Sequence, residues 1–131
     1  MPIHRIENFN DEMIWPTDDF TGEWIVEWPN GKIKFCSLYS KGKAEGDYLC
    51  YWENGNLAQK GYSSDGVCVG IWSDFWEDGT KFKETEFFSP ENFDVRWLTP
   101  NGRVGKIEIF RAEKEPQTKI LVPEFFDETS R

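Results

Sequence analysis

The stretch that decides the fold is residues 22–46, GEWIVEWPNGKIKFCSLYSKGKAEG. Every second residue of its first half is apolar, which is the periodicity of a β-strand: Trp24, Val26 and Trp28. Asn30-Gly31 follows, the dipeptide most typical of a two-residue type I′ hairpin turn. Further apolar residues suit a returning strand, namely Ile33, Phe35 and Tyr39. The stretch therefore predicts a β-hairpin.

The hairpin pattern recurs along the chain. The turn glycines lie 24, 24 and 23 residues apart, and each follows Asn or Asp, as at Gly31, Gly55, Gly79 and Gly102. Asn and Asp tolerate positive φ beside a glycine, so we expect positive φ at these turn glycines. Aromatic residues also recur, seven places and three places before the turn glycine: Trp24, Tyr48 and Trp72, then Trp28, Trp52 and Trp76. The chain is thus predicted to be a repeat protein.

The pattern G-x-W-x-x-x-W-x-N-G-x-L, followed by a glycine and the next G-x-W, resembles the variant MORN repeat of bacterial YwqK-type antitoxins. Residues 22–104 carry it, and the first two copies fit best. The third copy has Lys81 and Pro90 where an apolar residue and a glycine are expected, and the fourth keeps mainly Asn101-Gly102 and Val104. The resemblance implies an all-β, single-layer antiparallel meander of MORN-type hairpins, about eight strands with capped ends. It also implies an antitoxin or immunity role.

Three segments are expected. Residues 1–21 form an N-terminal cap or tail, residues 22–111 carry the hairpin repeats, and residues 112–131 form a C-terminal cap. Repeat arrays need atypical ends that cover exposed strand edges. The apolar residues suited to capping are Met13, Ile14, Trp15, Phe125 and Phe126. Residues 89–94 are expected to interrupt the regular sheet.

The net charge limits the classes of partner that the protein is expected to bind. The formal net charge is −9, which disfavours nucleic acid and anionic membrane surfaces and fits a basic protein partner. Three cysteines cannot all pair within one chain, and no apolar run near the N-terminus is long enough for a signal peptide. A reduced, cytoplasmic location is the expectation.

Catalysis finds little support in the residue types. The only histidine, His4, lies in the predicted tail, and the cysteines lack metal-site spacing. The glycines belong to turns rather than to a phosphate-binding loop before a helix. We therefore expect no enzyme activity, no cofactor and no metal.

The tryptophan columns predict an aromatic ladder on one face of the sheet. By strand alternation, the positions seven, five and three places before each turn glycine share that face. Trp52 is then expected at the centre of the core, between Trp28 and Trp76. The alternative is that the rings form a platform for a carbohydrate or another small ligand. Asp74 stands out because it is a carboxylate on the predicted aromatic face.

The opposite face supplies the predicted partner-binding residues. Its apolar members recur at the same two offsets and are expected to form one stripe: Ile25, Leu49, Tyr51, Phe75 and Leu98. Three acids are expected to form a rim around the stripe: Glu27, Glu53 and Glu77. A basic partner such as a toxin domain can cover this stripe, or the terminal caps can fold over it. A scaffold that self-associates through its sheet edges is a further alternative.

Overall fold

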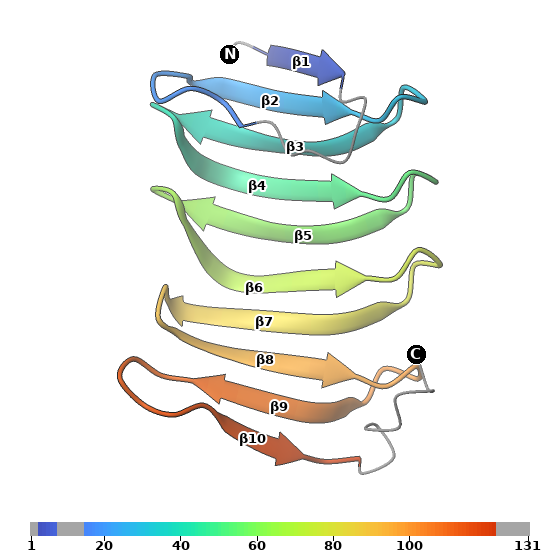
Figure 1. The fold of residues 1–131 in the computed structure, drawn as a ribbon, viewed down its shortest axis with the longest axis vertical. Coiled ribbons are helices and arrows are strands. Elements are labelled where there is room, and N and C mark those ends of the chain that lie inside the picture. Colours follow the sequence, from blue (N-terminus) through green and yellow to red (C-terminus); the bar gives the residue numbers. More distant parts are fainter. Residues whose placement is uncertain (1–2, 8–14, 123–131) are drawn as a thin grey trace.

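The computed structural model describes residues 3–7 and 15–122, and in them every regular element is a β-strand. Ten strands form one open sheet in chain order (Figure 1). The bounds are β1 Ile3–Glu7, β2 Gly22–Glu27, β3 Ile33–Ser40, β4 Lys43–Tyr51, β5 Leu57–Ser64, β6 Val67–Phe75, β7 Lys81–Ser89, β8 Asn92–Leu98, β9 Val104–Phe110 and β10 Gln117–Ile120. Strands β2 to β10 are antiparallel neighbours throughout, so the predicted all-β meander is confirmed.

Strand β1 was not predicted. Its backbone pairs in parallel with β2, from Ile3 opposite Glu23 to Glu7 opposite Glu27. Part of the N-terminal segment that the sequence indicated as a cap therefore extends the sheet by one edge strand.

The predicted interruption at residues 89–94 is wrong. Strand β7 ends at Ser89 and β8 begins at Asn92, so only Pro90 and Glu91 lie between them. The Asn92 side-chain amide donates a hydrogen bond to Ser89 Oγ over 2.6 Å and closes the turn. The sheet therefore passes through this segment without a break.

The four turns at Gly31, Gly55, Gly79 and Gly102 differ from the prediction in type. We call them the Asn-Gly turns, although Asp78 precedes the third glycine. The turn glycines have φ between 87° and 92°, as expected, but Asn30 does not have positive φ. Gly31 N donates to Trp28 O over 2.9 Å, and Trp28 N donates to Lys32 O over 2.7 Å. The loop thus has three residues, the arrangement in which an ordinary turn is followed by one left-handed glycine. The type I′ assignment at Asn30-Gly31 is wrong.

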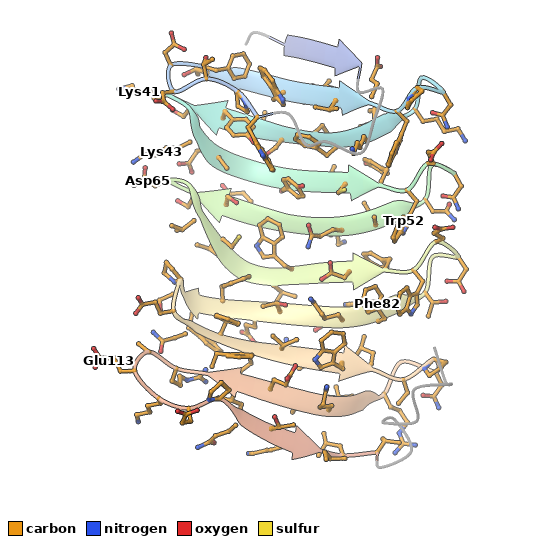
Figure 2. The ribbon with its side chains drawn as sticks, viewed as in Figure 1. Lys41, Lys43, Trp52, Asp65, Phe82 and Glu113 are labelled. Carbon is orange, nitrogen blue, oxygen red and sulfur yellow. The ribbon has the colours of Figure 1, made fainter. Side chains whose placement is uncertain are left out.

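Positive φ at both central residues, as in type I′ turns, occurs at the other ends of the strands. Lys41 and Gly42 have φ of 50° and 79°, and Asp65 and Gly66 have φ of 51° and 84°. In Figure 2, Lys41 and Asp65 lie at one end of the sheet, whereas Trp52 and Phe82 lie at the other. The turns after β3 and β5 therefore differ in type from the Asn-Gly turns on the other side of the sheet, and the turn after β7, Pro90-Glu91, has no positive φ.

One extra residue follows each Asn-Gly turn and shifts the register of the hairpin. Such a bulge reorients the side chains on one side of it. The extra residues are Lys34, Ala58, Phe82 and Gly105. The Lys34 ammonium group lies 4.8 Å from the Trp28 ring centroid, and the Phe82 ring stacks on Trp76 at 3.9 Å.

The tryptophans three places before the turn glycines therefore stand at the turns and not at the centre of the core. Trp28 Nε1 donates to Tyr51 O over 3.1 Å, and Trp52 Nε1 donates to Phe75 O over 3.0 Å. Both residues are only half-buried. The prediction of Trp52 as the central core residue is wrong, because the hairpin ends in a three-residue loop directly after it.

The aromatic ladder itself exists along a different path, on the face we call the aromatic face. Successive ring centroids lie 4.8 to 6.5 Å apart, and the rings come from every strand between β3 and β9 except β5. The rings are Phe35, Tyr48, Trp72, Phe87, Phe93 and Phe110. At the N-terminal end the fully buried core residues are Val26 and Phe35, which Trp24 and Tyr39 adjoin. The sheet thus fills one face with large rings.

Residues 15–21 cover the N-terminal end of the aromatic face. The Trp15 ring lies 5.4 Å from Phe35, and the Phe20 ring lies 5.2 Å from Trp24. Gly42 N donates to Phe20 O over 2.8 Å and holds the segment on the turn. The remaining predicted capping residues, Met13, Ile14, Phe125 and Phe126, lie outside the described residues.

The contact at Gly42 carries a testable prediction. A Cβ at Gly42 would overlap the backbone of Asp18, whereas a Cβ at Gly66 would have only ordinary contacts with Lys43, at 3.6 Å and beyond. Both glycines have positive φ in equivalent turns. Gly66→Ala should therefore cost about 1–2 kcal/mol from φ alone, and Gly42→Ala about 3 kcal/mol because overpacking is added. Equal unfolding midpoints in urea would show that residues 15–21 do not pack on this turn.

Candidate protein-interaction surface

The predicted apolar residues lie on one face of the sheet, which we call the opposite face. Strand pairing divides them into two rows. Ile25 and Leu49 belong to a middle row, in which Cys36 is the partner of both. Tyr51, Phe75 and Leu98 belong to a row beside the Asn-Gly turns. Ile25 is only 3% exposed, so it supports the sheet and offers little surface to a partner.

The row beside the turns, the turn-side row, is mostly apolar. Each hairpin contributes one residue from each strand, and the pairs are Glu27 with Ile33, Tyr51 with Leu57, Phe75 with Lys81, and Leu98 with Val104. All eight are partly exposed. Four of the predicted partner-binding residues, Glu27, Tyr51, Phe75 and Leu98, therefore lie in a row that crosses four repeats.

The three predicted rim acids do not form one line. Glu27 lies within strand β2, whereas Glu53 and Glu77 lie at the exposed tips of the Asn-Gly turns. The backbone oxygens of the latter two accept hydrogen bonds from the preceding turn: Asn30 Nδ2 to Glu53 O over 2.9 Å, and Asn54 Nδ2 to Glu77 O over 3.0 Å. The turns therefore carry acids at their tips, and Glu27 stands apart from them.

The middle row becomes ionic toward the C-terminal repeats. Arg96 contacts Glu86 at 3.0 Å and Glu84 at 3.2 Å, and Lys81 also pairs with Glu84. The hydrogen bond from Lys81, together with Arg96, lowers the pKa of the Glu84 carboxyl. The predicted apolar stripe therefore does not cross the whole sheet, because charged side chains that pair with one another occupy the middle row on β7 and β8.

The most exposed apolar side chains of the opposite face were missed from the sequence. Four of them form what we call the apolar patch, with exposed fractions between 39% and 57%: Tyr62, Val67, Ile71 and Phe88. Strand register joins the first three, because Tyr62 pairs with Val69, which stands two residues from both Val67 and Ile71. Phe88 lies on the next strand, β7, with the Arg111 guanidinium carbon 5.2 Å from its ring centroid. The signal was present in the alternation V-C-V-G-I at residues 67–71. The patch lies on β5 to β7, toward the ends opposite the Asn-Gly turns.

The aromatic face leaves little room for a ligand platform. Phe20 packs edge-on against Trp24, and Trp72 lies over Gly61 and beside Tyr48. The Trp97 ring has the ammonium groups of Lys83 and Lys106 at 5.1 and 5.2 Å from its centroid. These contacts occupy ring faces that a sugar would need.

Asp74 lies on the aromatic face as predicted and has a partner there. Gln59 Nε2 donates to its Oδ1 over 2.9 Å. Burial raises the pKa of the Asp74 carboxyl, and Lys83 and Gln59 oppose that shift. The hydrogen bond gives this half-buried carboxylate a structural explanation.

Residues 3–7 and 15–122 contain no group of metal-binding side chains and no membrane-spanning helix. Within these ranges no three His, Cys, Asp or Glu side chains come together in a way that could hold a metal ion. The same part of the chain contains no helix with the length and apolarity needed to cross a membrane.

The fold and its surfaces define a β-hairpin repeat protein. The family model described as the MORN repeat variant matches residues 20–41 and 44–65, which include the first two hairpins. No curated protein and no solved structure matches the chain. MORN repeats are in general non-enzymatic modules that bind proteins or membranes. The two matched segments are thus similar to that family, whereas the hairpins that follow continue its architecture with a weaker sequence pattern.

Proposed function

We propose that this protein is a non-catalytic interaction module that binds a protein partner through its opposite face. The apolar patch carries the proposal, because Ile71 and Phe88 are 52% and 57% exposed on neighbouring strands. Contiguous exposed apolar side chains on a soluble protein usually mark a contact surface. The turn-side row extends the same face toward the Asn-Gly turns.

The charge supports a basic partner. The chain carries a net charge of −9, and an exposed acid adjoins the apolar patch, because Asp47 is the strand partner of Tyr62. Glu86, the strand partner of Ile71, is already paired with Arg96. An apolar centre beside acidic groups favours a partner with apolar anchors and basic residues around them. A basic toxin domain neutralised in the bacterial cytoplasm is the partner class that the antitoxin resemblance suggests.

Self-association is a second candidate. All four residues of the C-terminal strand β10 are exposed. Edge strands of this kind pair readily with another chain. Binding through β10 would join copies edge to edge and would leave the apolar patch uncovered, so the two candidates predict different sensitive residues.

The test compares three variants of the full chain. Ile71→Glu combined with Phe88→Glu changes two exposed residues of the patch, Tyr51→Glu combined with Phe75→Glu changes the turn-side row, and Ile120→Glu is a matched control on β10, where Ile120 is 55% exposed. We expect capture of the partner from native lysate, identified by mass spectrometry, to be lost with each of the two double variants, both of them folded, and to be kept with the control. Unchanged capture by a folded patch variant contradicts the proposal, and loss with Ile120→Glu alone, together with a smaller particle mass, favours self-association.

A further inference from the structure

Three of the four Asn-Gly turns contain the dipeptide that gives them their name. An asparagine before a glycine is chemically labile, because the glycine amide nitrogen can attack the side-chain amide carbon without hindrance from a Cβ. The three dipeptides are Asn30-Gly31, Asn54-Gly55 and Asn101-Gly102. The rate of this reaction in a folded protein depends on how firmly each asparagine side chain is held.

The first asparagine is held at both ends of its side-chain amide. Asn30 Nδ2 donates to Glu53 O of the next turn over 2.9 Å, and Asn30 Oδ1 accepts from Lys32 N over 2.8 Å. The reaction requires the side-chain Cγ to move to bonding distance of Gly31 N, and this movement pulls the amide atoms away from their partners. The bond to the neighbouring hairpin therefore protects Asn30.

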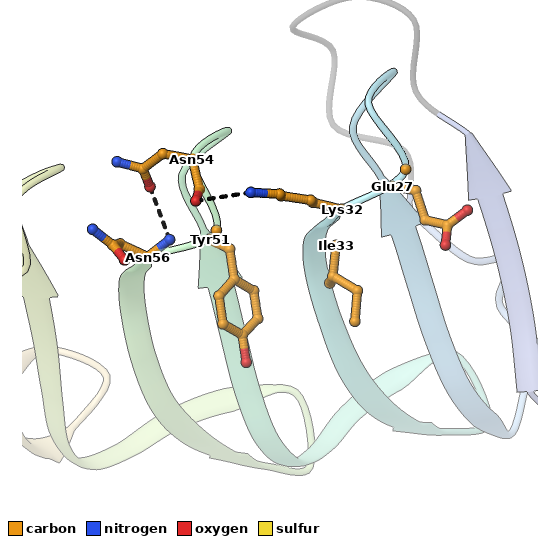
Figure 3. Close-up of a pocket in the computed structure, with 8 residues that line it drawn as sticks. Glu27, Lys32, Ile33, Tyr51, Asn54 and Asn56 are labelled. Atoms are coloured by element: carbon orange, nitrogen blue, oxygen red, sulfur yellow. Dashed lines mark hydrogen bonds between the residues drawn. The ribbon is translucent and has the colours of Figure 1, made fainter.

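The second asparagine is held in the same way. Asn54 Nδ2 donates to Glu77 O over 3.0 Å, and Asn54 Oδ1 accepts from Asn56 N over 2.8 Å. Figure 3 shows the bond from Asn56, together with the Lys32 ammonium group, which donates to Asn54 O over 3.1 Å. Asn54 is therefore bonded within its own turn, to the turn before it and to the turn after it.

The asparagine of the fourth turn is held only from within that turn. Asn101 Oδ1 accepts from Thr99 Oγ1 and from Arg103 N, the latter over 3.4 Å, which is longer than the 2.8 Å at Asn30. Among residues 3–7 and 15–122, Asn101 Nδ2 has no hydrogen-bond acceptor. The Asn101 amide can thus turn toward Gly102 N without breaking a bond to another hairpin.

The backbone and the local sequence do not distinguish the three sites. Each glycine nitrogen donates to the backbone oxygen three residues earlier over 2.9 Å, and each glycine has φ between 87° and 92°: Gly31, Gly55 and Gly102. The first and fourth turns even match in sequence, with Pro-Asn-Gly-Lys at 29–32 and Pro-Asn-Gly-Arg at 100–103. The difference therefore lies in what holds the asparagine side chain.

We propose that Asn101 is a site of spontaneous deamidation in the folded protein, and that Asn30 and Asn54 are protected. Hydroxide removes the proton from Gly102 N, this nitrogen forms a bond to Asn101 Cγ, and the Cγ–Nδ2 bond breaks. Nδ2 takes a proton from water and leaves as ammonia, so a succinimide ring remains. Water then opens the ring at one of its two carbonyl groups and gives aspartate or isoaspartate at position 101.

The third turn shows that this kind of loop accepts an aspartate. Asp78 Oδ1 accepts from Thr80 N over 2.8 Å, as the asparagine Oδ1 does in the two turns before it. The aspartate product at position 101 should therefore keep the turn, and it adds a negative charge close to the Leu98–Val104 end of the turn-side row. Isoaspartate instead inserts a methylene group into the backbone of the loop, so we expect it to distort the turn.

Peptide mapping by mass spectrometry measures the reaction at each asparagine separately. The full chain is incubated at mildly alkaline pH, both in buffer and in urea that unfolds it, and the loss of each intact Asn-Gly peptide is followed. In buffer we expect Asn101 to be lost about tenfold faster than Asn30 or Asn54, the factor that one additional hydrogen bond to break produces. In urea Asn30 and Asn101 should react at the same rate, because their flanking sequences match.

Urea concentrations below the unfolding transition show whether the folded turn itself reacts. The rates at Asn30 and Asn54 should rise with urea, because these sites react through unfolded chains, whereas the rate at Asn101 should stay constant. An Asn101 rate that rises as steeply would place the reaction in unfolded chains and overturn the proposal. Equal rates at the three sites in buffer would also overturn it, as would a faster loss of Asn101 than of Asn30 in unfolded chains.

Two matched substitutions test the reason given for the difference. Asn30→Asp removes the donor to Glu53 O and should lower the urea midpoint of unfolding. Asn101→Asp removes no bond to another hairpin in the described part of the chain and should leave the midpoint unchanged. Equal midpoints for the two variants would contradict the protective role of the bond to Glu53 O.

Discussion

Trp72→Ala is expected to destabilise the protein by about 3–5 kcal/mol, the cost usual for removing a large buried aromatic side chain. Trp72 is 8% exposed and lies in the middle of the ladder, with ring centroids of Tyr48 at 5.4 Å and Phe87 at 6.5 Å. Its Nε1 donates to Tyr62 O over 3.1 Å. The substitution therefore removes packing on both sides and leaves a backbone acceptor without this donor.

Urea denaturation followed by circular dichroism measures this loss. Trp15→Ala is the comparison, since Trp15 touches Phe35 in the ladder but is 56% exposed. We expect it to cost about 1 kcal/mol or less, because much of its surface is already in water. Trp52→Ala should fall between the two, since Trp52 is half-buried at a turn. Similar losses for Trp72 and Trp15 would mean that the ladder does not form the core.

Gly61→Ala is expected to cost about 3 kcal/mol, at the upper end of what overpacking usually costs. Gly61 lies on β5 directly under the Trp72 indole, and an added Cβ would overlap three atoms of that ring. The backbone of Gly61 does not have positive φ. The expected loss therefore comes from the space occupied by Trp72 and not from strain in the backbone.

A double-mutant cycle tests this cause. In the Trp72→Ala background the indole is absent, so Gly61→Ala should then cost less than about 1 kcal/mol. Unfolding free energies of the two single variants and the double variant give the coupling directly. Additive losses would show that the Gly61 effect has another origin and would contradict the packing of Trp72 over β5.

The repeat architecture was predictable because its signals are local. Alternation in residues 24–28 and the spacing of Gly31, Gly55 and Gly79 depend on side-chain direction and on φ at single residues. Both properties are determined by residues within a single hairpin. The meander and the positive φ of the turn glycines are accordingly confirmed in all four repeats.

The turn types and the bulges were not predictable in the same way. Asn-Gly fits a two-residue turn, and it equally fits the end of a three-residue loop, so the residues at 30–31 do not distinguish them. One extra residue after a turn, such as Lys34, then shifts the strand register. Counting positions from the turn glycine therefore no longer predicts how deeply Trp52 is buried. Pro90 indicated an interruption, although proline also suits the second position of a tight turn.

The candidate site was predictable in part for the same reason. Alternation placed Tyr51, Phe75 and Leu98 on one face, and the register of the hairpins confirms that they share a row. Ile71 and Phe88 were missed because they lie in the halves of the strands that the turn-based alignment did not cover. The alternation at residues 67–71 indicates which face Ile71 is on, but the exposed fraction of its side chain depends on what the neighbouring strands leave uncovered.

The side-chain hydrogen bonds between successive turns all run in one direction, from an earlier hairpin to the next one along the chain. In the first hairpin the Trp28 and Asn30 side chains donate to backbone oxygens of the second, and Trp52 and Asn54 do the same toward the third. In the fourth turn the equivalent residues are Thr99 and Asn101, which bond to each other instead. A chain synthesised from its N-terminus therefore adds its second and third hairpins onto donors that the preceding hairpin already presents. The third turn has Asp78 at the place of Asn30 and Asn54, and its carboxylate accepts a hydrogen bond from Thr80 N within the same turn.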